Sequence, residues 1–278
     1  MTSFQKDGLK QKLLQRKTVY GTCITINAPR WPKLVAQANL DFVFLDTEHI
    51  ALDRTELSKM CYTYRALGLT PIVRIPQPDP YRASQVIDDG AVGVVAPYLE
   101  KADEIKKLVG ATKYRPLKGE KLNDIMDGKT RPSPELQAYL DAYNHGNLCI
   151  ANIESMPAVE KLDKLLSTDG LDGVFIGPHD LSVNMGIPEQ YDHPDFTKTV
   201  KTIIQKARKY TLGVGIHFSL KPERQLHWIK EGINIVIHSS DMALFSQRLR
   251  SDMAVLKSMD KHHKTDEEEA PSYSFTFI

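Results

Sequence analysis

Two stretches, Ile150-Ala-Asn-Ile-Glu154 and Gly173-Val-Phe-Ile-Gly-Pro-His-Asp-Leu-Ser182, decide the fold class of this 278-residue chain. Each is an apolar run of the β type that leads to a carboxylate, Glu154 in the first and Asp180 in the second. The two carboxylates are 26 residues apart, which is about the length of one strand–helix repeat in an α/β protein. In a parallel barrel, successive strands therefore bring both carboxylates to the same rim, the face where such folds carry their chemistry.

The rest of the chain continues this alternation. The predicted strands are residues 19–26, 42–46, 71–75, 92–97, 148–153, 173–177, 212–217 and 233–238. Most are continuously apolar, as strands covered on both faces are. Helical patterns lie between them, for example at residues 54–67, 102–109, 158–166, 196–210 and 222–230. The pattern predicts an α/β fold, a single (β/α)8 TIM barrel. The alternative, an open sheet, is less favoured because it would carry a Gly-rich phosphate loop early in the chain, and the sequence has none there.

The ends of the chain and one long connection add to this plan. Residues 9–16 predict a helix across the bottom of the barrel, and residues 243–259 predict an extended C-terminal helix. We expect the barrel domain to span residues 1–260 and a charged, flexible tail to occupy residues 261–278. The connection over residues 114–147 is unusually long, and we expect it at the active-site rim as a lid or subunit contact.

Composition narrows the classes of partner. The 36 Lys and Arg residues balance 35 Asp and Glu residues, so no charge footprint predicts a nucleic-acid or membrane partner. Cys23, Cys61 and Cys149 are scattered through apolar runs, which favours inert core thiols in a reducing compartment. No apolar run approaches the ~20 residues that span a bilayer, and the N-terminus shows no signal-peptide pattern. We expect a cytoplasmic protein that acts on a small molecule.

Polar side chains gather where the predicted strands end. The strand ends carry Asp46-Thr-Glu-His49, Arg74, Glu154, Gly177-Pro178-His179-Asp180, His217 and His238-Ser-Ser-Asp241. Two hard oxygen ligands, Glu154 and Asp180, suit a divalent cation that keeps positions open for substrate. Asp180 has a second interpretation, as a helix N-cap, and His217 has one as part of the pocket wall.

Two further residues have a structural and a functional interpretation. His49 fits a capped loop histidine, but Asp46 and Glu48 beside it favour a catalytic histidine, because a carboxylate fixes its tautomer and raises its basicity. Arg74 either pairs with a buried carboxylate such as Asp88 or faces a developing enolate or a carboxylate substrate.

Four stretches resemble the metal-dependent, class II pyruvate aldolase family of 4-hydroxy-2-oxoheptanedioate aldolase, which is related to the citrate lyase β-type lyases. They are Asp41-Phe-Val-Phe-Leu-Asp-Thr-Glu-His49, Pro71-Ile-Val-Arg74, Ile87-Asp-Asp-Gly-Ala91 and the stretch from Gly173 to Ser182, in the family's order. The similarity runs from about Leu9 to Leu256. It implies a (β/α)8 barrel, often hexameric, whose C-terminal helix packs on a neighbouring subunit, so we expect a homo-oligomer.

The resemblance also implies roles for individual residues. Catalytic roles fall to His49, Arg74, Asp46 and Asp88, with Arg74 at the keto oxygen and the two aspartates supporting the site. Glu154 and Asp180 correspond to the ligands of a divalent cation, Mg²⁺, Mn²⁺ or Co²⁺. The backbone of residues 178–180 would hold the pyruvate carboxylate. Together with the polar residues at the strand ends, this leads us to expect substrate binding at Gly177, Pro178, His179, Asp180 and His217.

The expected reaction is cleavage of a 4-hydroxy-2-oxo acid to pyruvate and an aldehyde through an enolate, with His49 as the base, acting directly or through water. The loop Tyr114-Arg-Pro-Leu-Lys-Gly-Glu-Lys121 lacks the family's Arg-Gly, which leaves the aldehyde open. The alternatives are a CoA-thioester lyase, with a phosphate patch of Arg115, Lys118 and Lys121 near the rim, an enolate-using decarboxylase like macrophomate synthase, and a non-catalytic barrel.

Overall fold

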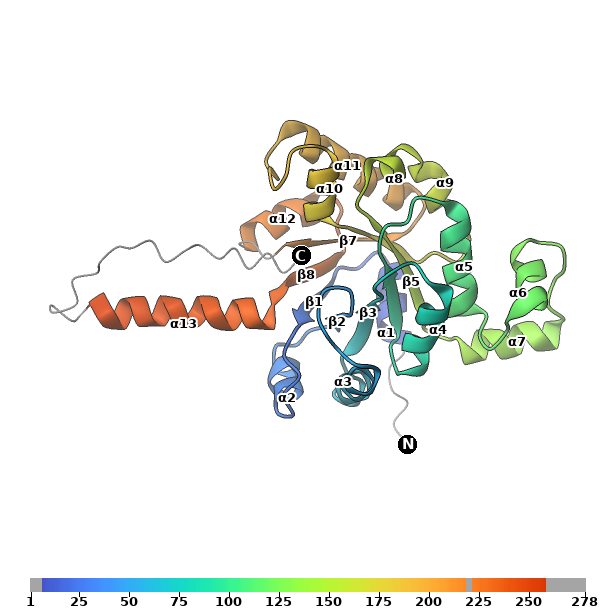
Figure 1. Ribbon diagram of the computed structural model, residues 1–278, viewed down its shortest axis with the longest axis horizontal. Helices are drawn as coiled ribbons and strands as arrows, with labels where there is room; N and C mark the ends of the chain where they lie inside the picture. Colours follow the sequence, from blue (N-terminus) through green and yellow to red (C-terminus); the bar gives the residue numbers. More distant parts are fainter. Residues whose placement is uncertain (1–6, 219–221, 259–278) are drawn as a thin grey trace.

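Eight parallel strands close into a barrel in the order of the sequence in a computed structural model, which describes residues 7–218 and 222–258 (Figure 1). The strands are β1 (Val19–Ile24), β2 (Phe42–Asp46), β3 (Thr70–Arg74), β4 (Gly93–Ala96), β5 (Leu148–Ile153), β6 (Gly173–Ile176), β7 (Gly213–Phe218) and β8 (Ile235–Ser240). Pairing of β1 with β8 completes the barrel. The predicted (β/α)8 fold is confirmed, and the end of every predicted strand lies within two residues of the observed one.

Helices follow the strands and cover the barrel. They are α1 (Asp7–Leu14), α2 (Trp31–Ala36), α3 (Arg54–Ala66), α4 (Pro80–Asp88), α5 (Ala102–Lys113), α6 (Gly119–Met126), α7 (Pro134–Tyr143), α8 (Met156–Glu160), α9 (Leu162–Leu166), α10 (Pro178–Asn184), α11 (Pro194–Lys209), α12 (Pro222–Glu231) and α13 (Asp241–Ser258). The single helix predicted over residues 158–166 is instead two short helices, because the backbone leaves the helical region at Lys161. No described helix is both long and apolar enough to cross a membrane.

The barrel interior is a packed apolar core, not a channel. Its side chains are Leu9, Leu13, Val19, Cys23, Phe42, Phe44, Ile72, Val95, Leu148, Ile150, Phe175, Ile235 and Ile237. Leu9 and Leu13 come from α1, so this helix closes the bottom as predicted. Glycines make room for the largest rings: a Cβ on Gly21 would lie 2.5 Å from the ring of Phe42, its partner on the next strand. The other residues of each strand point outward and pack against the helices.

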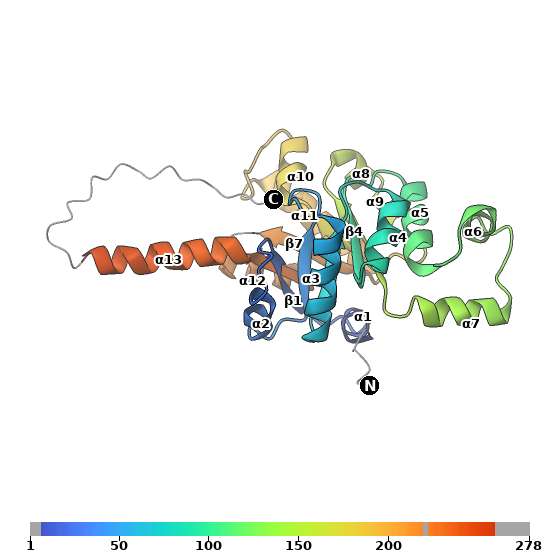
Figure 2. The same cartoon turned by 60° about the horizontal axis from the view of Figure 1, so that its bottom comes forward.

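The long connection between α5 and β5 lies away from the rim, contrary to our expectation. Since α5 runs antiparallel to the strands, the chain leaves it at the N-terminal face of the barrel and enters β5 from the same face. Helix α6 packs on the outer side of α5, where Asp127 Oδ1 lies 2.7 Å from Lys106 Nζ. Figures 1 and 2 show α6 and α7 as an arm that projects from the barrel wall. Arg115, Lys118 and Lys121 therefore do not form a phosphate patch at the rim.

The C-terminal helix α13 projects from the opposite side of the barrel (Figures 1 and 2). It confirms the predicted extended helix, and its apolar side chains Met242, Leu244, Phe245, Leu249, Met253, Val255 and Leu256 are exposed in the single chain. The predicted tail, residues 261–278, lies outside the described residues. All three cysteines are buried, as expected, and burial raises the pKa of each thiol.

Gly21→Ala is expected to destabilise the barrel by about 1–3 kcal/mol, because the new methyl group would press into the buried ring of Phe42. Urea unfolding of the variant and the wild type measures the difference. Gly8→Ala is the control, since a Cβ on Gly8 in α1 meets nothing within 4 Å. Adding Phe42→Leu should recover part of the loss, and a Gly21→Ala variant as stable as the wild type would contradict this account of the core.

Candidate active site

A buried ion pair joins the ends of β2 and β3. Asp46 and Arg74 are direct partners in the strand register, and the guanidinium donates from Nε to Asp46 Oδ1 at 2.9 Å and from Nη2 to Oδ2 at 2.5 Å. Arg74 also lies over the ring of Phe44, 5.8 Å from its centroid. Burial opposes its charge, but the Asp46 hydrogen bonds and charge prevail and raise the pKa of Arg74. The result is a permanent positive charge in a fixed position.

The turn after β2 places Glu48 and His49 beside this pair. The Glu48 N–H donates to Asp46 Oδ1 at 3.0 Å, and Glu48 Oε2 lies 3.2 Å from Arg74 Nε and 3.5 Å from His49 Nε2. Burial raises the pKa of Glu48 to about 7, against the opposing effect of Arg74. Burial and the charge of Arg74 lower the pKa of His49. A lowered pKa favours the neutral imidazole of His49, the form that accepts a proton.

Glu154 lies just past the end of β5 and is almost completely buried. Its Oε1 accepts a 2.7 Å hydrogen bond from the Tyr98 N–H, and its Oε2 accepts one from the side-chain amide of Asn152. A Cβ on Gly177 would lie 2.5 Å from Glu154 Oε2, so only glycine leaves room for the carboxylate there. Burial raises the pKa of Glu154 to about 7; the Tyr98 N–H counteracts it, and the charge of Asp180 adds to it.

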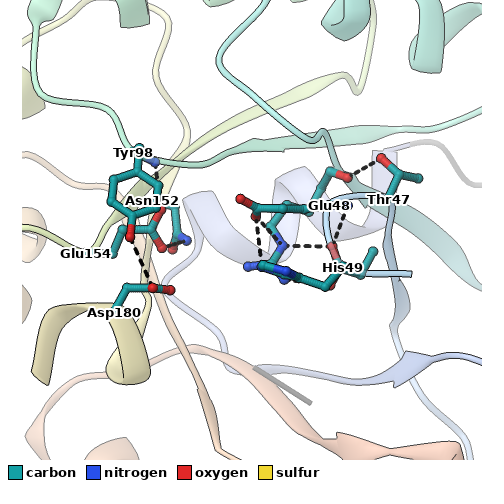
Figure 3. A network of polar contacts seen from close by, with 9 residues as sticks. Thr47, Glu48, His49, Tyr98, Asn152, Glu154 and Asp180 are labelled. Carbon is teal, nitrogen blue, oxygen red and sulfur yellow. Dashed lines mark hydrogen bonds and ion pairs between the residues drawn. The ribbon is translucent and has the colours of Figure 1, made fainter. Parts of the chain in front are cut away.

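Asp180 lies in the first turn of α10, which begins directly after β6. Its carboxylate accepts a 3.1 Å hydrogen bond from the Tyr98 hydroxyl, so Tyr98 contacts Asp180 and Glu154 together (Figure 3). Burial, followed by the charge of Asp180, raises the pKa of Tyr98 to about 12. The N-cap residue of α10 is Gly177, so the interpretation of Asp180 as a helix cap is wrong.

The residues present fit a divalent cation. Asp46 and Glu48 contact the one guanidinium, and the charges of Glu154 and Asp180 act on the same cluster, which therefore has more acidic groups than its own cation can balance. Among the described residues, no three His, Cys, Asp or Glu side chains are grouped to hold a metal ion. A cation here would have Glu154 and Asp180 as its only protein ligands, and its other coordination positions would stay open. Mg²⁺ prefers such hard oxygen ligands and is commonly bound through only one or two carboxylates.

The expected substrate-binding residues line one pocket at this rim. Arg74, Gly177, Pro178, His179, Asp180 and His217 all contribute to its wall. His217 Nε2 lies 3.2 Å from the carbonyl oxygen of Ser239, and its ring lies 6.3 Å from that of Phe44. His179 is 40% exposed, with Nδ1 3.5 Å from Glu189 Oε1. The strands and α10 thus bring these predicted residues together.

Asp88 is not brought to this pocket within the chain. It is the last residue of α4, a helix that runs from the rim to the N-terminal face, and its side chain forms an ion pair with Arg115 after α5. The side chain is 55% exposed. Asp88 therefore lies outside the pocket of the single chain, and Arg74 pairs with Asp46 and not with Asp88. A supporting role for Asp88 in the site stays a prediction.

The polar end of β8 has a structural role. Asp241 is buried and accepts hydrogen bonds from the Thr25 and Ile26 backbone and from the Trp31 indole, which tie the start of α13 to the loop after β1. His238 Nδ1 lies 2.9 Å from Gln225 Oε1 on α12. These side chains are not part of the pocket wall described above.

The sequence profile of the HpcH/HpaI aldolase/citrate lyase family matches residues 24–247, most of the chain. The chain belongs to this family. The resemblance and the expected class, an enzyme and a lyase of the aldolase type, are confirmed.

Members of the family and related folds match nearly the full length of the chain. The 2-keto-3-deoxy-L-rhamnonate aldolase of Escherichia coli O17:K52:H18 is 25% identical over 258 residues, 93% of this chain and 96% of the relative. The HpcH/HpaI aldolase from Desulfitobacterium hafniense DCB-2 has a TM-score of 0.79 and 26% identity, with 91% of this chain and 98% of that one covered. Macrophomate synthase, with a TM-score of 0.74, 22% identity and coverage of 91% and 89%, shares the fold.

Sequence reasoning missed three residues of this HpcH/HpaI-type site. Glu48 was noted only as a neighbour of His49, although it contacts both His49 and Arg74. Asn152 shares the inward face of β5 with Ile150 and Glu154, so the two-residue period of a strand would have found it. Tyr98 gives no such signal, because one of its two hydrogen bonds to the site comes from its backbone N–H, which does not depend on residue type.

His217→Gln is expected to make stability less sensitive to acid. Burial lowers the pKa of His217 to about 4, from 6.5, so the unfolded chain binds an extra proton between these values. The contribution of this group to the free energy of unfolding is fully present above pH 6.5. It is lost as the pH falls towards 4, by about 3 kcal/mol in total. Urea unfolding from pH 4 to 7 should show a flatter acid limb in the variant, while exposed His227→Gln should follow the wild type. Parallel curves for His217→Gln and wild type would contradict the assignment.

Proposed function

We propose that this chain is a metal-dependent aldolase that cleaves 4-hydroxy-2-oxo acids to pyruvate and an aldehyde through a pyruvate enolate. The observation that carries the proposal is that Arg74 and Asp180 line one pocket, with Glu154 fixed beside Asp180 through Tyr98. A permanent cation and a pair of oxygen ligands then face the same small volume. The 2-keto acid in the name of the Escherichia coli relative supports this substrate class.

Glu154 and Asp180 would hold the cation, which we propose to be Mg²⁺, Mn²⁺ or Co²⁺. When bound, such an ion supplies positive charge to the 2-oxo and carboxylate oxygens of the substrate. Residues 178–180 form the first turn of α10, and the backbone N–H groups of His179 and Asp180 suit the substrate carboxylate. His179 and His217 would border the remainder of the substrate.

The protein's own residues then carry the proton and charge steps. Neutral His49 accepts the proton of the 4-hydroxyl group, directly or through water, and the C3–C4 bond breaks to release the aldehyde. The bonding electrons move into the C2–C3 bond as negative charge develops on the C2 oxygen, where Arg74 stabilises it. Asp46 fixes the guanidinium through Nε and Nη2, and Nη1 takes no part in these two bonds. Protonation of the enolate at C3 gives pyruvate.

The described strands offer no residue for the competing imine mechanism. None of the eight strands in the described chain contains a lysine, the nucleophile that a Schiff-base aldolase needs.

The CoA-thioester lyase alternative has lost the observation that favoured it, because its basic loop residues lie away from the rim. We further propose a cytoplasmic homo-oligomer, supported by the apolar side chains that α13 exposes.

Exchange of the pyruvate methyl protons in deuterated water tests the enolate half-reaction without knowledge of the aldehyde. We expect NMR to show exchange with Mn²⁺ or Mg²⁺, and none with chelator or in Glu154→Gln, which keeps the shape of the side chain but loses its charge. A folded Glu154→Gln variant that exchanges at the wild-type rate would contradict the ligand assignment. Absence of exchange in a metal-loaded wild type would contradict the proposed reaction.

Arg74→Lys is expected to lower the exchange rate by about 100- to 1000-fold, because a point charge cannot reproduce the planar fork that Asp46 fixes. The Kd for Mn²⁺ should change little, since Arg74 is not a ligand. Arg65→Lys on the outer helix α3 is the matched control and should keep the wild-type rate. An unimpaired Arg74→Lys variant would show that the guanidinium does not face the enolate oxygen.

A further inference from the structure

Tyr98 contacts both proposed cation ligands from a single position. It follows β4 and Pro97, and its backbone N–H donates to Glu154 Oε1 at 2.7 Å while its hydroxyl donates to Asp180 Oδ1 at 3.1 Å. Figure 3 shows its ring above Glu154, with the hydroxyl directed at Asp180. Glu154 comes from β5 and Asp180 from α10, so Tyr98 connects carboxylates that two different elements provide.

The backbone of Tyr98 is in the left-handed region, with φ at 47°. A non-glycine residue adopts this conformation at a cost, and it persists only where the surrounding contacts determine it. Here the unfavourable backbone conformation directs the Tyr98 N–H at the carboxylate of Glu154, to which it donates a hydrogen bond. The side chain is not a core residue, since Tyr98 is 49% exposed. Packing therefore does not explain the hydroxyl contact.

The donors leave the two carboxylates able to bind a cation. An ionised carboxylate oxygen has two lone pairs, and Tyr98 uses one pair on Glu154 Oε1 and one on Asp180 Oδ1. Asn152 occupies one further position, on Glu154 Oε2. Like charges on the two side chains act on each other and would otherwise favour a wider separation. The N–H and O–H donors of Tyr98 instead hold the carboxylate oxygens of Glu154 and Asp180 in one relative position.

We propose that Tyr98 is a positioning residue for the divalent cation, whose backbone N–H and hydroxyl hold Glu154 and Asp180 in the arrangement that the ion binds. This inference rests on the proposed function in so far as these two carboxylates are the ligands. Tyr98 acts through the carboxylates, so its effect is on cation affinity. Once the ion is bound, the chemistry of the pocket proceeds without it.

The test is a titration of the metal-free full-length protein with Mn²⁺, followed by the EPR signal of the free ion. We expect Tyr98→Phe to weaken Mn²⁺ binding by about 10- to 100-fold, the usual effect of losing a group that orients a ligand. The unfolding midpoint of the metal-free variant should stay close to that of the wild type. Tyr139→Phe, on the exposed face of α7, is the control and should bind Mn²⁺ as the wild type does. A Kd for Tyr98→Phe within about twofold of wild type would overturn the proposal.

Two further measurements separate this proposal from the proposed function. Pyruvate proton exchange by Tyr98→Phe should be slow at low Mn²⁺ and return to the wild-type rate at saturating Mn²⁺; a deficit that persists at saturation would overturn a purely positioning role. If wild type binds no Mn²⁺, the proposed function itself fails. If wild type binds and Glu154→Gln does not, an unchanged Tyr98→Phe removes Tyr98 alone. Should Tyr98→Phe not fold, Tyr98→Asn decides, because asparagine tolerates the left-handed backbone and lacks the phenol.

Discussion

The ion pair between Asp46 and Arg74 is the interaction on which the rest of the rim depends. It joins adjacent strands in register, and the same Asp46 carboxylate accepts the N–H of Glu48, so it also fixes the turn that carries His49. A buried ion pair contributes little net stability, because desolvation offsets the attraction. Its value here is positional: it holds one permanent cation above Phe44 while leaving part of the guanidinium uncommitted.

The barrel divides along its axis into an apolar part and a charged part. Below the rim, Phe42, Phe44 and Phe175 fill the interior, and glycines on neighbouring strands accept their rings. Above it, carboxylates outnumber the single guanidinium. Burial at the mouth disfavours the charged form of a carboxylate, which is why the pKa values of Glu48 and Glu154 rise to about 7. A cation bound there would relieve the imbalance.

The two-residue period of strands explains what could be predicted from sequence. Apolar runs that end at Asp46, Arg74, Glu154 and His217 had to deliver those side chains to one rim once the barrel was assumed. Asp88 and residues 114–147 lie away from the rim of the single chain for one reason: a helix returns the chain to the opposite face, and a motif match does not encode that direction. Tyr98 was beyond prediction because its left-handed backbone and its N–H contact depend on the folded turn, not on its side chain.

The arm formed by α6 and α7 has a practical consequence for handling the protein. Its turn, at residues 128–132, follows α6, the helix that packs on the outer side of α5 and not over the mouth of the barrel (Figure 2). Lys129 in this turn is well exposed. A fluorophore, an affinity handle or a surface tether attached there would leave the pocket open to small molecules. The arm is therefore a natural anchoring point for an immobilised form of the protein, with the reactive face directed to solution.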